Sequence, residues 1–213
     1  RKAAQAELKN IPRPLALKLL ERSLAAEGDT LRIIESLNVL ETIKGDSALA
    51  RQLFNKYSGH LDSAVSLAAL RSIAKYRDDE SFNLVASHIK DKDPEVRHRI
   101  LNYLCWNFEE RCLSFALAAF HDGDHRVRRT AALIMGSLKA EEAMTGLITL
   151  LNDPDKDVQE SANSSLKKIT GKDFGFNPSA SQARRDEAVD GWNKWWRENQ
   201  AKFGRPKHNV AAA

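Results

Sequence analysis

Residues 91–97 read DKDPEVR, and residues 153–159 read DPDKDVQ. The two segments start two periods of 31 residues apart, and one column of aliphatic residues recurs along the chain at the same interval. That column consists of Ile34, Val65, Val96, Val127 and Val158. A fixed period of this length is typical of stacked structural units, none of which can bury its apolar face alone.

Neighbouring columns repeat with the same spacing. Five positions before the aliphatic column stand Asp29, His60, Asp91, Asp122 and Asp153, in which histidine replaces aspartate in the second repeat. Four and eight positions after it stand apolar residues, namely Ala69, Ile100, Ala131 and Ala162, then Ile73, Leu104, Met135 and Leu166. A turn-forming residue followed by apolar residues at this spacing predicts that an amphipathic helix opens each unit.

The third unit also shows a second helix. Residues 94–108 form the first helix, with Asp93 suited to the N-cap and Pro94 to the first helical position. Residues 110–120 are predicted as the second helix, whose apolar face is Leu113, Ala116, Leu117 and Phe120. In the following first helix, residues 126–138, we expect Gly136 to let neighbouring helices approach closely. No strand pattern of period two is long enough to predict a sheet.

Four segments follow from these patterns. Residues 1–28 are predicted as a basic segment with one helix, and residues 29–170 carry the repeats. Residues 171–200 are predicted as a capping loop and helix, and residues 201–213 as a disordered tail. The last unit of an open stack needs a cover with a polar outer face. We predict that its apolar inner face comprises Phe174, Phe176, Trp192 and Trp196.

The net charge of +4 is unevenly placed. Residues 1–22 carry +4 and residues 201–213 carry +3, so the body between them holds 24 basic against 27 acidic residues. A groove for a phosphate backbone needs the opposite distribution, which argues against nucleic acid as the partner. No apolar run approaches the roughly 20 residues that span a bilayer, so we expect a soluble cytoplasmic or periplasmic protein. The chain begins at Arg1 without methionine, as a trimmed product would.

Residues 91–97 and 153–159, together with RTAALIMGSL at 129–138, resemble the short HEAT-like repeats of phycobilisome-lyase-like and other bacterial HEAT-repeat proteins. The segment ITGKDFGFNP at 169–178, followed by several tryptophans, resembles an aromatic C-terminal ending of such proteins. The resemblance implies an all-α fold, a right-handed α-solenoid of about five HEAT-like helix pairs. It implies an adaptor or scaffold, with a tetrapyrrole lyase or chaperone as the alternative and a nucleic-acid-binding protein as a lesser one.

Two segments resemble metal-binding sites, but the sequence evidence for each is weak. Residues 121–125, HDGDH, place four potential metal ligands in five positions, but the acids fall at the turn and cap positions of the repeat. Residues 153–157 open like a calcium loop, yet no glycine stands at the sixth position and Ser164 occupies the twelfth. We therefore predict no metal, no cofactor and no catalytic residue.

Other reactive or charged residues also favour structural roles. Cys105 and Cys112 are too few for a disulfide framework, and a buried cysteine without a nearby histidine is usually inert. Trp106 with Glu109 is a poor match to the site of a HEAT-like DNA glycosylase. Five arginines on first helices could contact phosphates or pair with loop acids along the stack, and we favour the second interpretation. They are Arg97, Arg99, Arg126, Arg128 and Arg129.

The second helices carry the functional prediction. Between the apolar positions of each second helix lie two positions that point outward. These outward positions hold mostly small polar residues and almost no charge. In repeat order these predicted partner-binding residues are Gln52, Lys56, Asn83, Ser87, Ser114, Thr145 and Thr149. In helix-pair solenoids the second helices usually line the concave side, so this stripe is suited to packing against a protein or peptide. We therefore predict a non-enzymatic scaffold with a protein or peptide partner.

Overall fold

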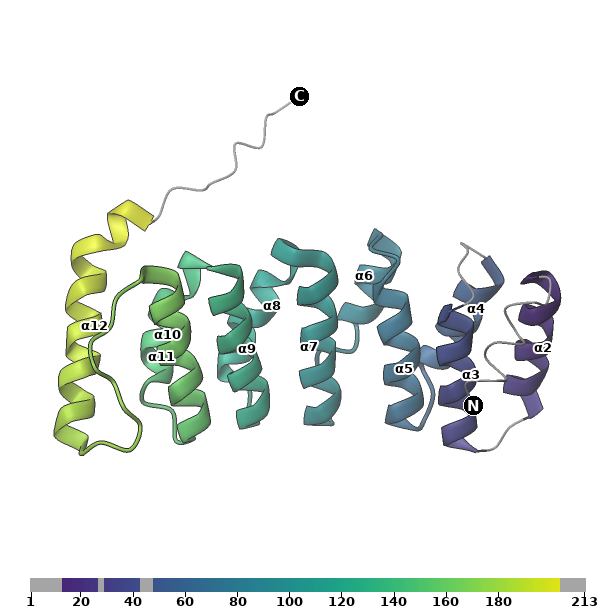
Figure 1. Cartoon of the computed structure of the whole chain (residues 1–213), viewed down its shortest axis with the longest axis horizontal. Helices are drawn as coiled ribbons and strands as arrows, with labels where there is room; N and C mark the ends of the chain where they lie inside the picture. The colour runs from purple at the N-terminus through teal and green to yellow at the C-terminus, as the bar shows by residue number, and fades with distance from the viewer. Residues whose placement is uncertain (1–12, 27–28, 43–47, 204–213) are drawn as a thin grey trace, which may run out of the picture. The chain divides into compact units, whose positions relative to one another are not determined.

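The computed structural model describes residues 13–26, 29–42 and 48–203. The predicted N-terminal segment at 1–12 and the tail from residue 204 onward therefore lie outside the described residues. The chain divides into two compact units, Arg1–Phe108 and Glu109–Ala213, which we call unit 1 and unit 2. Across the described residues every regular element is a helix, which confirms the predicted all-α helical-repeat fold (Figure 1).

Unit 1 contains the first helical pairs. Its helices are α2 (Arg13–Ala26), α3 (Thr30–Thr42), α4 (Ala48–Ser58), α5 (Ser63–Ala74), α6 (Asp79–Ala86) and α7 (Pro94–Phe108). Helices α3 and α5 pack side by side, as do α5 and α7, and α4 and α6 are the second helices of their pairs. Helix α2, the helix expected within residues 1–28, packs on α3 and α4.

Unit 2 continues the pattern with shorter second helices. Its elements are the 3₁₀ turn η1 (Glu109–Cys112), α8 (Leu113–Ala118), η2 (Ala119–His121), α9 (His125–Leu138), η3 (Glu141–Ala143), α10 (Met144–Leu150), α11 (Lys156–Thr170) and α12 (Gln182–Phe203). The second helix predicted over residues 110–120 is thus split into one α-helical and two 3₁₀ segments. No side chain caps the start of α8, and the 3₁₀ turn η1 directly precedes it.

The repeated aliphatic column forms the core, with one correction. Val65, Val96, Val127 and Val158 are buried, with at most 3% of each residue exposed. In the first repeat Ile33 is buried and Ile34 is only half-buried, so the predicted position is wrong by one residue. The 31-residue register does not extend to this repeat, because α3 starts 33 residues before α5, whereas the later first helices start 31 residues apart. Each valine is the third residue of its helix, and Ile33 is the fourth residue of α3.

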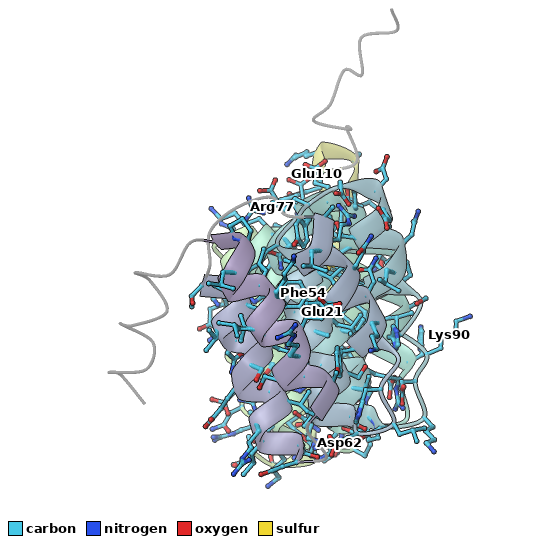
Figure 2. All side chains as sticks on the ribbon, turned by 90° about the vertical axis from the view of Figure 1, so that its right-hand side faces the viewer. Glu21, Phe54, Asp62, Arg77, Lys90 and Glu110 are labelled. Atoms are coloured by element: carbon cyan, nitrogen blue, oxygen red, sulfur yellow. The ribbon has the colours of Figure 1, made fainter. Side chains whose placement is uncertain are left out.

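The loops before the first helices repeat two backbone contacts. His60 Nδ1 and the carboxylates of the matching aspartates each accept a hydrogen bond of 2.8–3.0 Å from the backbone N–H two residues ahead; these aspartates are Asp91, Asp122 and Asp153. Two positions further on, a second column accepts at 2.9 Å and caps the helix; its members are Asp62, Asp93, Asp124 and Asp155. In unit 1, Asp62 lies at this loop edge and Arg77 at the opposite edge (Figure 2).

A glycine permits the close packing of α9 and α11. A Cβ atom on Gly136 would lie 2.6 Å from Ser165 Cβ and 2.8 Å from Ser165 Cα, far inside van der Waals contact. Ser165 is fully buried and its hydroxyl donates to the Ala132 carbonyl at 2.7 Å. This confirms the prediction that Gly136 allows neighbouring helices to approach closely.

Candidate protein-interaction surface

All seven predicted partner-binding residues are exposed on second helices, and we call this set the second-helix stripe. In unit 1 it comprises Gln52 and Lys56 on α4, with Asn83 on α6 and Ser87 just after it. In unit 2 it comprises Ser114 on α8 and Thr145 and Thr149 on α10. Their exposure follows from the buried neighbours on the same helices, which fix the outward face; these include Leu53, Phe54, Val85, Ala116, Leu147 and Ile148.

Several polar side chains of the stripe have unused hydrogen-bonding capacity. The hydroxyls of Ser87 and Thr149 donate to carbonyls of their own helices, at 2.7 and 3.0 Å. Among the described residues, by contrast, the side chains of Gln52, Asn83 and Ser114 have no hydrogen-bond partner within the protein. Their amide and hydroxyl groups are therefore available to an incoming backbone or side chain.

The C-terminal segment covers the end of unit 2. Phe176 and Trp192 are buried, with 5% and 0% exposed, and Phe174 packs against Trp192 with ring centroids 4.7 Å apart. The loop before α12 is attached to α11, because the Asn163 amide donates to the Phe176 carbonyl at 3.2 Å. Phe174, Phe176 and Trp192, three of the four predicted cap residues, thus pack at this end of unit 2, where α12 is the last helix and packs on α10 (Figure 1).

The fourth predicted cap residue has a different environment. Trp196 is half-exposed, and its indole Nε1 donates to the Thr145 hydroxyl at 3.2 Å. Helix α12 therefore packs on α10 and reaches the second-helix stripe, a contact across 51 residues that the sequence pattern did not reveal. Helix α12 also continues to Phe203, so the first three residues of the predicted tail at 201–213 are helical instead.

The arginines of the first helices serve mainly structural roles. In unit 2, Arg128 forms a bidentate ion pair with the buried carboxylate of Asp153, at 2.7 and 2.8 Å, and this hydrogen bonding raises the pKa of Arg128. The side chain of Arg128 also donates to the carbonyl of Asp122 in its own loop. Arg99 and Arg126 pair locally with acids of their own helix or cap. Arg128 thus pairs with an acid of the next loop, as the structural interpretation predicts, whereas the ion pairs of Arg99 and Arg126 are local.

A second-helix ion pair anchors α4 to α6 within unit 1. Arg51 donates to both carboxylate oxygens of Asp78, at 2.5 and 2.8 Å, and also contacts Glu80 at 2.9 Å. The hydrogen bonds from Arg51 and from Ser81 hold the pKa of Asp78 well below its usual range. These charges lie at the N-terminal end of α6, and the stripe itself remains nearly neutral.

The candidate metal and cysteine positions are occupied by other contacts. His125 lies 3.1 Å from Asp155, and Asp124 caps α9 while pairing with Arg126. Throughout the described ranges, no group of three or more His, Cys, Asp or Glu side chains is arranged to hold a metal ion. Cys105 and Cys112 are disulfide-bonded, so the described part of the chain holds no free thiol that could act as a nucleophile.

Residues 113–180 match the family model of HEAT repeats. The match supports the HEAT-repeat part of the resemblance and carries no information on bacterial origin or on the lyase-like type. No curated protein matches the sequence. None of the helices in the described ranges is both long enough and apolar enough to span a bilayer.

Three solved structures are similar at low identity. An engineered protein from the Northeast Structural Genomics Consortium has a TM-score of 0.49 at 17% identity, over 90% of this chain and 99% of that one. A second engineered protein from the same consortium has a TM-score of 0.48 at 15% identity, over 88% and 59% of the two chains. Human deoxyhypusine hydroxylase in complex with glycerol has a TM-score of 0.38 at 13% identity, over 93% and 90%. At these scores the likeness carries no argument about function.

Proposed function

We propose that this protein is a scaffold or adaptor that binds a protein or peptide along the second-helix stripe. The observation that carries the proposal is the exposure of all seven stripe residues, which are small or uncharged except Lys56. Helical repeats present surfaces of this kind, and neighbouring repeats within a unit offer equivalent positions. The unsatisfied amide and hydroxyl groups of the stripe supply hydrogen bonds to a partner without the cost of breaking existing ones.

The near-neutral charge of the stripe restricts the kind of partner that can bind it. Few ions are released when an uncharged surface is covered, so binding should depend only weakly on salt concentration. A polyanion is poorly suited to this surface, because Lys56 is the one cation in the stripe. The expected occupant is therefore an extended or helical protein segment that is itself mostly uncharged along the contact.

The test adds bulk and charge to the stripe without disturbing the core. The partner is first captured with the intact chain and identified by mass spectrometry, and its affinity is then measured by calorimetry at low and high salt. Asn83→Arg combined with Ser114→Arg should weaken binding at least about tenfold, because a buried unpaired charge is costly at an interface. Circular dichroism should show an unchanged fold, since both positions are exposed.

A matched control carries the same charge change on first helices. Thr42 and Ser137 are also exposed polar residues, one in each unit, and their double substitution by arginine should leave affinity within about twofold. If the control variant loses binding and the stripe variant keeps it, the partner occupies the first-helix face and the proposed site is wrong.

A further inference from the structure

The end of α12 carries aromatic surface beyond what the core of unit 2 requires. Trp192 is fully buried and already closes the seam with Phe174. Beyond it, Phe203 contacts the rings of Trp195 and Trp196, with centroids 5.5 and 5.8 Å away in edge-to-face arrangements. These three outer rings are only half-buried, so they form an accessible aromatic cluster beside Thr145 of the stripe in unit 2.

The position of Trp196 is fixed by the stripe itself. Its Nε1 donates to the Thr145 hydroxyl at 3.2 Å, which satisfies the only polar atom of the indole. The ring therefore offers a partner its π-face and edge, and it has no further hydrogen bond to give. A tryptophan held in this way is a suitable platform for a cation, since the ring face is electronegative.

A free carboxylate lies one helical turn from the same threonine. Glu142 in η3 precedes Thr145 on α10 by three residues, and residues at this spacing share one face in both 3₁₀ and α-helical turns. Glu142 is exposed, and no described residue forms a hydrogen bond or ion pair with it. Some other acids of unit 2 are engaged, for example Asp153 with Arg128 and Asp173 with Lys167. Lys202, which precedes Phe203, donates to Asn199.

We propose that Trp196 and Glu142 form an anchor for an arginine or lysine side chain of the partner that occupies the stripe. The cation would stack on the indole and pair with the carboxylate, while the rest of the segment follows the neutral hydroxyls of Thr145 and Thr149. Charge complementarity selects this occupant, because an aromatic face beside an unpaired carboxylate attracts cations and repels acids. The inference rests on the proposed function and adds the chemical class of the residue that is recognised.

The probe is a synthetic decapeptide, acetyl-(Gly-Ser-Arg-Ser-Gly)₂-amide, with versions that carry glutamine or glutamate instead of arginine. Each is titrated into the full chain while the four indole N–H signals are followed by ¹⁵N NMR and assigned with tryptophan-to-phenylalanine variants. The arginine peptide should shift Trp196 and leave Trp106 and Trp192 in place. Glutamine and glutamate peptides should give at most a small fraction of that shift.

Two substitutions test the anchor and one matched substitution controls it. Glu142→Gln and Trp196→Leu should each weaken binding of the arginine peptide about three- to fivefold, the range expected for one exposed ion pair or cation–π contact. Both sites are partly or fully exposed, and circular dichroism checks that each variant is folded. Glu160→Gln removes an equally exposed, unpaired carboxylate on α11 and should leave affinity unchanged.

Several outcomes would overturn the anchor. Equal shifts from the arginine and glutamine peptides would do so, as would normal binding by Glu142→Gln. Removal of residues 204–213, which include Arg205 and Lys207, provides a further test. If that truncation alone shifts Trp196, the chain's own basic end occupies the anchor instead of a partner. A stripe variant that abolishes partner binding while the arginine peptide leaves Trp196 unmoved would refute the anchor and retain the proposed function. If the stripe variant still binds the partner while the arginine peptide shifts Trp196, the stripe is refuted and the anchor is retained.

Discussion

Replacing Gly136 by alanine should destabilise the protein, although alanine is the better helix former. In an exposed helix the exchange would gain about 0.8–1.0 kcal/mol. Here the new Cβ would lie 2.6 Å from Ser165 Cβ and 2.8 Å from Ser165 Cα. A backbone atom cannot move by changing a rotamer, so α9 and α11 must separate by roughly an ångström, and overpacking of this kind costs about 1–3 kcal/mol.

The separation also weakens a buried hydrogen bond. The Ser165 hydroxyl donates to the Ala132 carbonyl at 2.7 Å, and loss of such a bond costs about 1 kcal/mol. After subtraction of the propensity gain, the expected net loss is about 1–3 kcal/mol, or roughly 3–10 °C in the melting temperature of a chain of this length. Urea denaturation followed by circular dichroism at 222 nm measures the difference.

Gly123→Ala is the matched control, because nothing lies within 4 Å of a Cβ at that loop position. It should change stability by less than about 0.5 kcal/mol. If Gly136→Ala is as stable as the wild type or more stable, helix propensity has prevailed. In that case α9 and α11 do not pack as closely as the structure places them, and the argument fails.

Four further predictions concern the core, the ion pairs and the cap. Leu101→Ala should cost about 2–5 kcal/mol because Leu101 is fully buried, whereas Ser114→Ala should cost less than about 0.5; similar urea midpoints would contradict this. Arg128→Ala should cost about 2–4 kcal/mol, since it leaves a buried carboxylate unpaired; an unchanged midpoint would show that water replaces the guanidinium. Because folding lowers the pKa of Asp78, its stabilising effect is complete above the unfolded value near 4 and is lost as pH falls below it. Asp78→Asn should therefore flatten the loss of stability in acid, and parallel pH profiles for the two proteins would contradict the assignment. Truncation after Gly171 should expose the end of unit 2 and cause aggregation, whereas a monodisperse, equally stable product would make α12 a free binding element.

The repeat period predicted the core well because burial of one face requires regular spacing. The four valines of the aliphatic column are buried as expected, since each stands three residues after a capping aspartate. The first repeat differs because its connection to the next is two residues longer. Ile33 and Ile34 are adjacent and equally apolar, so hydrophobicity alone could not reveal which of them faces the core.

The histidine in the aspartate column shows how chemistry can be kept when residue type changes. A neutral imidazole has one acceptor nitrogen, and His60 Nδ1 accepts from the Asp62 N–H at 3.0 Å. The aspartates of the column accept the same bond at 2.8–2.9 Å. The sequence marked His60 as an exception, yet the local geometry of the loop needs only an acceptor at that position.

The environment of Trp196 could not be predicted from local spacing. Its position four residues after Trp192 places both on one helical face and predicts a common role in the cap. Only the tertiary packing of α12 on α10 separates them, because one indole is buried in the seam and the other reaches Thr145. The sequence therefore identified the helix and its apolar side, and the structure divides that side into a structural and an accessible part.

The two faces of the repeats use their polar side chains differently, and this difference supports the placement of the binding site. On first helices of unit 2, polar side chains are engaged with loop acids: Arg128 forms an ion pair with Asp153, and His125 Nδ1 lies 3.1 Å from the Asp155 carboxylate. A partner on that side would have to compete with bonds already formed. On the second-helix stripe, Ser114 has no partner among the described residues, and Thr149 bonds only within its own helix. Binding there replaces water alone, so the same contacts yield more net affinity.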